Sequence, residues 1–181
     1  MSCGGGCGGT CGGCRCGGGC GCWTMCNVAK APGAGTSMAD VQIAMAKVFL
    51  PLAGGTLTQL MASMGTPWSF DPPPGSVLFI EDIGERPYRI HRMLTQAAQA
   101  GIFVNAAAIV FGEFPGCDEP GGDPAIRDVL RDFTQDFRGP VLFNFPSGHT
   151  TGPSWTLPFG VKAEVIGGPA PALRILEAAV E

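Results

Sequence analysis

The sequence has little charge, no basic cluster and no long apolar run, and each shortage excludes a class of protein. Asp, Glu, Lys and Arg make up 14% of the 181 residues, and the formal net charge is −4. Without a cluster of Lys and Arg, a nucleic-acid-binding surface is not expected. No run of 18 apolar residues occurs, so no membrane span is expected. The first thirty residues lack an apolar h-region, which disfavours a secretory signal and makes the cytoplasm the expected compartment.

Cysteine is rare except at the start of the chain. Eight of the nine cysteines lie within residues 1–26, where nearly everything between them is glycine. The eight are Cys3, Cys7, Cys11, Cys14, Cys16, Cys20, Cys22 and Cys26. The stretch has no apolar periodicity, so a disordered head is expected, and residues 31–37 have the composition of a linker. The sequence therefore predicts a Gly/Cys-rich head and linker over 1–37 and one domain over 38–181.

Three interpretations of this head stay open. Cys14/Cys16 and Cys20/Cys22 are Cys-x-Cys pairs, and in such pairs two thiolates can reach one soft cation. The head is in this respect similar to the thiolate-rich end of a metallothionein, which implies zinc or copper(I). A disulfide-bonded head is the second interpretation, although an intracellular setting disfavours it. The third is a leader without function, read from GC-rich DNA upstream of a true start at Met38 or in another frame.

After the linker, strand and helix signals alternate. Strands are predicted at 48–50 (stopped by Pro51), 76–82, 107–111, 141–145 and 161–166. Helices are predicted at 57–64, at 87–98, at 124–137 with Asp123 as N-cap and Pro124 at the first position, and at 173–180. Apolar residues at i, i+3, i+4 and i+7 carry the helix predictions. The alternation predicts an α/β domain with a mostly parallel sheet, in which chemistry collects beyond the carboxyl ends of the strands.

Two of these strand ends carry candidate catalytic residues. Glu81 closes an apolar strand, and His149, one of two histidines, follows another strand in a loop. A histidine together with a carboxylate that accepts its imidazole N–H makes up two of the three members of a Ser-His-acid relay. The residues alone are also compatible with purely structural roles: Glu81 could pair with Arg86 or Arg89, and His149 could be an ordinary loop histidine.

Three further residues have simpler expected roles. Asp82 alternates with Glu81 along the strand, so it should face the other way and cap the turn that follows. His91 belongs to an exposed helix face, and Cys117 is expected to be a packed small residue.

Several motifs occur together in one order. They are PLAGGTL at 51–57, GTP at 65–67, FIEDIGERPYRI at 79–90, IVFGEF at 109–114 with Cys117-Asp118-Glu119, and GH followed by TLPFG at 148–160. Over residues 46–166 they resemble the C-terminal domain of the LD-carboxypeptidase family, bacterial serine peptidases that trim murein tetrapeptides. The resemblance implies a compact β/β/α domain in which Glu81 is the acid and His149 the base. Glu113, at the end of its strand, is a candidate to line the same cleft and to act indirectly, through the catalytic residues. This chemistry needs no cofactor.

The nucleophile is missing from this pattern. In the family, the serine and the oxyanion donors belong to an N-terminal domain, which the preceding forty Gly/Cys-dominated residues cannot hold. Ser147 lies too close in sequence to His149 to replace it. We therefore expect a domain that is inactive alone and that needs a serine domain from elsewhere or a second copy of itself to act on a murein peptide. The rival hypothesis is a thiolate metal-binding protein whose globular part is a passive carrier.

Overall fold

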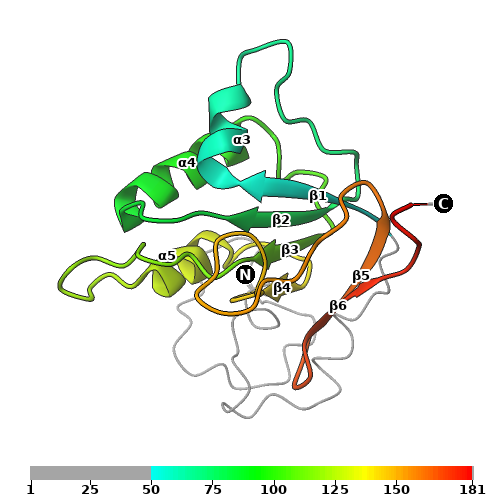
Figure 1. The fold of residues 1–181 in the computed structure, drawn as a ribbon. Coiled ribbons are helices and arrows are strands. Elements are labelled where there is room, and N and C mark those ends of the chain that lie inside the picture. The colour runs from blue at the N-terminus through cyan, green and yellow to red at the C-terminus, as the bar shows by residue number, and fades with distance from the viewer. Residues whose placement is uncertain (1–49, 181) are drawn as a thin grey trace, which may run out of the picture.

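The computed structural model describes residues 50–180, in which six strands form one sheet (Figure 1). The elements are β1 (Leu50–Thr56), α3 (Leu57–Ser63), β2 (Val77–Glu81), α4 (Pro87–Gln99), β3 (Ala108–Phe111), α5 (Ile126–Phe133), β4 (Val141–Leu142), β5 (Lys162–Ile166) and β6 (Ala172–Ile175). The eight cysteines of the head and the predicted boundary at 37/38 lie outside the described residues. None of the helices within 50–180 is long and apolar enough to cross a membrane.

The strand order is β4-β3-β2-β1-β5-β6. Strands β1 to β4 pair in parallel, and β5 and β6 join the β1 edge in antiparallel fashion. This arrangement confirms the predicted α/β class with a mostly parallel sheet. The carboxyl ends of β1, β2 and β3 therefore meet at one edge of the sheet, and the candidate catalytic residues lie there.

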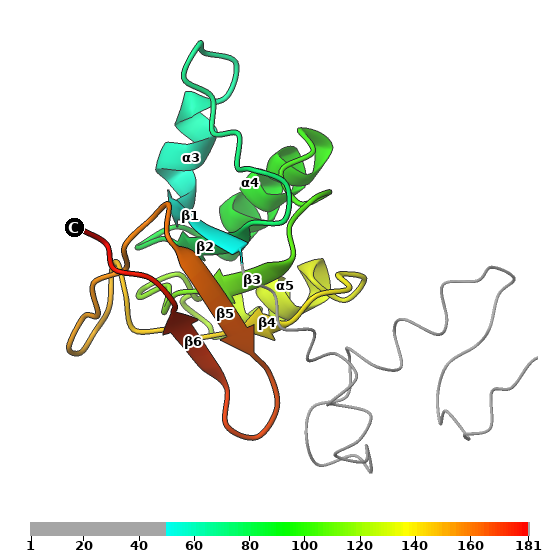
Figure 2. The ribbon, with the colours of Figure 1, turned by 90° about the vertical axis from the view of Figure 1, so that its right-hand side faces the viewer.

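Both faces of the parallel strands are covered. On one face, Leu78 and Ile80 of β2 pack with Ile90 and Leu94 of α4. On the other face, Phe79 packs in a cluster that includes residues of β5. Figure 2 shows the hairpin of β5 and β6 in front of the parallel strands, on the side away from α4. Burying each large side chain stabilises the fold by about 1.5–3 kcal/mol, and double coverage explains why β2 has no polar alternation.

The prediction that Pro51 stops a strand was wrong. β1 instead runs through Pro51 and continues to Thr56. Proline has no N–H, but at this position near the start of the strand it does not interrupt pairing. The next residue, Leu52, donates its N–H to the carbonyl of Val161 at 2.9 Å. Helix α3 then follows directly, and Gly65 beyond its end has φ +80°.

Helix α5 differs from its prediction at both ends. It begins at Ile126 rather than after Asp123, because the Ile126 N–H is capped by the carboxylate of Asp118 at 2.7 Å. It ends at Phe133, where the Thr134 hydroxyl donates to the carbonyl of Leu130 at 2.9 Å. Side-chain capping from a residue distant in sequence leaves no local signal that a pattern could detect.

The last third of the chain also departs from expectation. β4 is limited to two residues, and Asn144 beyond it has φ +57°, which ends the extended conformation. The helix predicted at 173–180 was wrong, because Ala172–Ile175 pairs with β5 as strand β6. Glu164 of β5 is buried and lies 3.4 Å from the guanidinium of Arg174 on β6. This cross-strand pair favours a strand over a helix.

Candidate active site

Strand β2 places Glu81 at the carboxyl edge of the sheet. The side chain of Glu81 is only 3% exposed. Its register partner at the end of β1 is Thr56, whose hydroxyl donates a hydrogen bond to Oε1. Burying a carboxylate is unfavourable unless it is hydrogen-bonded. The parallel pairing of the two strands places the Thr56 hydroxyl where it supplies one of these hydrogen bonds.

The loop after β4 brings His149 onto the other carboxylate oxygen. Glu81 Oε2 lies 2.8 Å from His149 Nδ1, and it also accepts the backbone N–H of His149 at 2.9 Å. An ionised carboxylate can only accept hydrogen bonds, so the proton of a neutral imidazole is on Nδ1 and the lone pair is on Nε2. The side chain of His149 is 45% exposed. The structure thus brings together the two residues expected to form the relay, and their contact favours the tautomer that a general base requires.

Two glycines make this contact possible. A Cβ on Gly112 would lie 2.6 Å from Glu81 Cβ. A Cβ on Gly148, which has φ +72°, would lie 2.7 Å from both Cγ and Cδ of Glu81. Any side chain at either position would push Glu81 away. Nothing in the sequence indicated the close approach at Gly148 or the need for glycine at 112.

Asp82 is buried beside Glu81 but serves another set of donors. Its Oδ2 accepts the N–H and the hydroxyl of Thr58 at 2.9 and 2.8 Å, and its Oδ1 accepts the N–H of Ile83 at 2.8 Å. The expected cap of the following turn is present. The hydrogen bonds from Thr58 were not expected, and they hold the start of α3 against the end of β2.

Glu113 lies at the same edge, just beyond β3, and contacts the loop that carries His149. Its Oε2 accepts the N–H and the hydroxyl of Thr151 at 2.8 and 2.9 Å. The backbone N–H of Thr151, followed by the hydroxyls of Thr150 and Thr151, holds the pKa of Glu113 below its ordinary value. Glu113 therefore stays charged and holds the loop two residues past His149.

A hollow of about 440 Å³ opens beside Glu81. It is lined by Gly55, Thr56, Phe79, Glu81, Ser147, Gly148 and residues 154–157 and 159. Trp155 is 66% exposed and Phe159 is 48% exposed, and the Phe159 ring lies 6.2 Å from the ring of Phe79. From the sequence, residues 150–160 stood out only as part of a motif. Two aromatic residues in a loop that follows a candidate histidine were the available signal.

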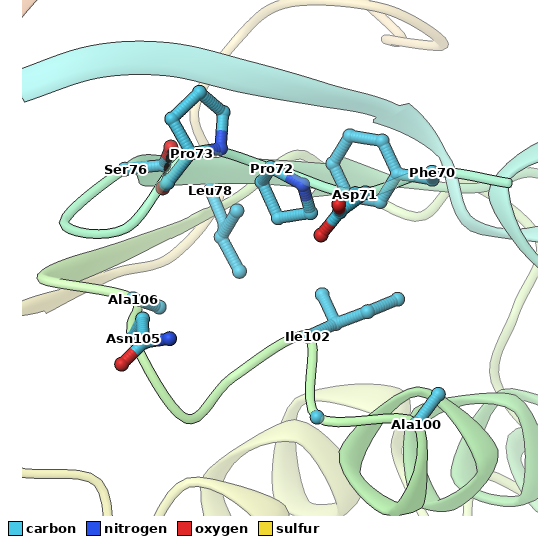
Figure 3. Close-up of a pocket in the computed structure, with 11 residues that line it drawn as sticks. Phe70, Asp71, Pro72, Pro73, Ser76, Leu78, Ala100, Ile102, Asn105 and Ala106 are labelled. Carbon is cyan, nitrogen blue, oxygen red and sulfur yellow. Dashed lines mark hydrogen bonds between the residues drawn. The ribbon is translucent and has the colours of Figure 1, made fainter.

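A second cavity, of about 70 Å³, lies at the opposite end of the sheet (Figure 3). The loop before β2 forms one wall, with Asp71 and Pro72, and the segment after α4 forms the other, with Ile102 and Asn105. The N–H of Gly75 donates to the carbonyl of Asn105 at 2.6 Å across this end. Because these residues precede β2 and β3, the cavity is remote from Glu81.

The five serines at positions 50–180 do not include an evident nucleophile. The hydroxyls of Ser63, Ser69, Ser76 and Ser147 each donate to a backbone carbonyl. Ser147 is buried, and its acceptor is the carbonyl of Trp155 at 2.7 Å. The fifth, Ser154, is exposed on the rim of the hollow, and no sequence pattern had pointed to it.

No metal centre occurs within the described part of the chain, since no three of its His, Cys, Asp or Glu side chains gather closely enough to hold an ion. Cys117 is buried, as expected, and burial raises the pKa of its thiol. His91 is exposed on α4, also as expected. The metal-binding prediction concerns residues 1–26 and stays a prediction.

The chain matches the model of the LD-carboxypeptidase C-terminal domain over residues 51–165. It is 37% identical over 131 residues to the "Probable murein peptide carboxypeptidase" of Bacillus subtilis, covering 71% of this chain and 40% of that protein. It is 31% identical over 112 residues to the microcin C7 self-immunity protein MccF of Escherichia coli, covering 62% of this chain and 32% of that protein.

Solved structures show the same likeness. The muramoyltetrapeptide carboxypeptidase of Oxalobacter formigenes superposes with a TM-score of 0.62 at 35% identity, covering 70% of this chain and 45% of that one. MccF in complex with glutamyl sulfamoyl guanosine superposes with a TM-score of 0.66 at 28% identity, covering 75% and 40%. The chain spans about two fifths of the length of the curated relatives it matches, 38% and 40% of the first two.

Proposed function

Because the chain belongs to the LD-carboxypeptidase family, we propose that its described domain supplies the acid–base half of a serine carboxypeptidase. The substrate we propose is a murein tetrapeptide, and the product is the tripeptide that remains when the terminal D-alanine is released in peptidoglycan recycling. The names of two relatives, a murein peptide carboxypeptidase and a muramoyltetrapeptide carboxypeptidase, support this substrate class.

The observation that carries the proposal is the bond between Glu81 and His149. Glu81 Oε2 holds the ring at Nδ1 and leaves Nε2 as the basic nitrogen. Nε2 would take the proton of a serine hydroxyl as its oxygen attacks the carbonyl of the scissile bond. The same nitrogen would then give that proton to the amine of the departing D-alanine. Water, activated in the same way, would release the acyl group as the new carboxylate.

Glu81 would act on the charge that develops in the ring. When Nε2 accepts a proton, the imidazolium is stabilised by the carboxylate 2.8 Å away. Glu81 is almost fully buried, so water screens this attraction only from the side of the half-exposed ring. Thr56 donates to the other carboxylate oxygen and fixes the plane of the group.

The serine and the oxyanion donors would come from outside residues 50–180. Four of the five serines in this range already donate to backbone carbonyls. We propose as partner a serine domain of the kind that the family resemblance implies, or a second copy of the chain. The edge that bears Glu81, His149 and the exposed aromatics Trp155 and Phe159 is where that partner would meet the substrate.

The test is the release of D-alanine from a murein tetrapeptide. The full chain is assayed alone and after mixing with the serine domain of a relative. The mixture should turn over, and His149→Ala should abolish release, whereas His91→Ala, on an exposed helix face, should not change it. The chain alone should release none, because a base without nucleophile and oxyanion donors retains little of the rate enhancement.

Two results would contradict the proposal. One is turnover by the mixture that His149→Ala leaves intact. The other is turnover by the chain alone that Ser147→Ala or Ser154→Ala abolishes, because the nucleophile would then belong to this domain.

A further inference from the structure

We propose that Glu113 is a positioning residue, which holds the loop of His149 so that the imidazole meets Glu81. The effect of Glu113 on catalysis rests on the proposed function above. The effect of Glu113 on the position of the His149 ring does not depend on that function.

Two carboxylates from neighbouring strands hold alternate backbone N–H groups of one loop. Glu81 Oε2 accepts the N–H of His149 at 2.9 Å, and Glu113 Oε2 accepts the N–H of Thr151 at 2.8 Å. Glu81 ends β2, and Glu113 follows the end of β3 by two residues. The two strands pair in parallel, with Ile80 opposite Phe111, so both carboxylates are presented at the same edge of the sheet.

The loop is closed at its base but is open to solvent at its tip. The Trp155 N–H donates to the carbonyl of Pro146 at 2.8 Å, and the Ser147 hydroxyl donates to the carbonyl of Trp155 at 2.7 Å. Residues 151–154 between these anchors are exposed, so little apolar packing fixes them. Hydrogen bonds to the two carboxylates are thus the main restraint on the segment that contains His149.

The bonds at Glu113 are strong ones for a partly exposed residue. One oxygen receives both the N–H and the hydroxyl of Thr151. Hydrogen bonds to an ionised acceptor are roughly twice as strong as those between neutral groups. The depressed pKa of Glu113 follows from the same donors, and it keeps this acceptor charged near neutral pH.

Loss of Glu113 would therefore loosen the loop without disturbing the core. Glu113 lies outside the helices and strands, while the buried clusters are built from other residues. The ring of His149 would then leave Glu81 for part of the time. Because an error of about 1 Å in the position of a catalytic group can cost 10²-fold in rate, this loosening would lower turnover.

The experiment is solution NMR of the full ¹⁵N-labelled chain. The probes are the Nδ1–H proton of His149 and the hydrogen exchange of the Thr151 amide. Glu113→Ala removes the acceptor, and Glu113→Gln keeps an acceptor oxygen without the charge. Glu119→Ala is the control, because Glu119 is also a partly exposed carboxylate with one strong partner, Arg86.

Glu113→Ala should speed exchange of the Thr151 amide by roughly tenfold or more, because a bond to a charged acceptor contributes about 1.5–3 kcal/mol. It should also broaden or abolish the Nδ1–H signal. Glu113→Gln should restore both in part, and Glu119→Ala should change neither. A wild-type Nδ1–H signal and wild-type Thr151 exchange in Glu113→Ala would overturn the proposal. If Glu113→Ala fails to fold, the same two readouts in Glu113→Gln decide.

The assay of D-alanine release separates this inference from the proposed function. In the reconstituted mixture, Glu113→Ala should lower kcat and leave KM unchanged, and an unchanged kcat would overturn the effect on catalysis. If the wild-type mixture shows no turnover, the proposed function fails. The NMR result still decides whether Glu113 positions His149.

Discussion

Replacing Gly148 with alanine should separate the His149 loop from Glu81. The new Cβ would lie 2.7 Å from Cγ and Cδ of Glu81 and 2.9 Å from Oε2, at a backbone φ of +72°. The left-handed conformation alone costs an L-residue about 1–2 kcal/mol. Relief of the clash must move the loop or the buried carboxylate, and each lost hydrogen bond to a charged group costs about 1.5–3 kcal/mol. Together these contributions predict a destabilisation of roughly 3–5 kcal/mol.

The assay is urea denaturation of the full chain together with a thermal scan. A loss of about 3 kcal/mol should lower Tm by roughly 10 °C or more in a domain of this size. Gly152→Ala is the matched control, because it lies in the same loop, has no heavy atom within 4 Å of an added Cβ and has no positive φ. It should change stability by less than about 0.5 kcal/mol, as surface substitutions do. If Gly148→Ala proves as stable as Gly152→Ala, the loop does not pack on Glu81 as described.

Other expected outcomes concern a threonine, a thiol and the head. Thr56→Val leaves one carboxylate oxygen of buried Glu81 without its hydrogen-bond donor and should lower the free energy of unfolding, measured by urea denaturation, by about 1–3 kcal/mol. An unchanged free energy of unfolding would show that Thr56 does not stabilise Glu81. Cys117 is buried and the pKa of its thiol is raised. Its contribution to stability should therefore be full below the ordinary thiol pKa of about 8.5 and should be lost as pH rises through the higher pKa of the folded state. Fast reaction with a thiol reagent near neutral pH would refute a buried thiol of raised pKa. If the head binds metal, the chain purified from zinc-supplemented cells should carry roughly two or three zinc equivalents; a metal-free chain with eight freely titratable head thiols would leave only the leader interpretation.

The sequence was sufficient for the parallel strands β2 and β3 and for the meeting of Glu81 with His149. Strand β2 is a run of apolar residues that ends on a carboxylate, and the loop after β4 contains the histidine beside a glycine. Parallel strands place such ends at one edge of a sheet, so the two residues could be brought together without knowledge of side-chain contacts.

The features that the sequence did not reveal depend on partners distant along the chain. Helix α5 starts where the carboxylate of Asp118 caps Ile126, eight residues away. The C-terminal segment forms β6 because it can pair with the edge of β5, and because Arg174 of this segment can form an ion pair with Glu164 of β5. Gly112 must be a glycine because Glu81, thirty-one positions earlier, occupies the space of its side chain. Such requirements exist only in the folded molecule.

The most direct test of the relay is a double-mutant cycle on Glu81 and His149 in the reconstituted mixture. The rate of D-alanine release is measured for wild type, Glu81→Gln, His149→Ala and the double variant. If Glu81 acts through the ring that it holds at 2.8 Å, Glu81→Gln should lower kcat by roughly 10³–10⁴-fold. The double variant should then be no slower than His149→Ala alone, because members of one relay are strongly non-additive. Losses that multiply, or a Glu81→Gln variant as fast as wild type, would contradict the account.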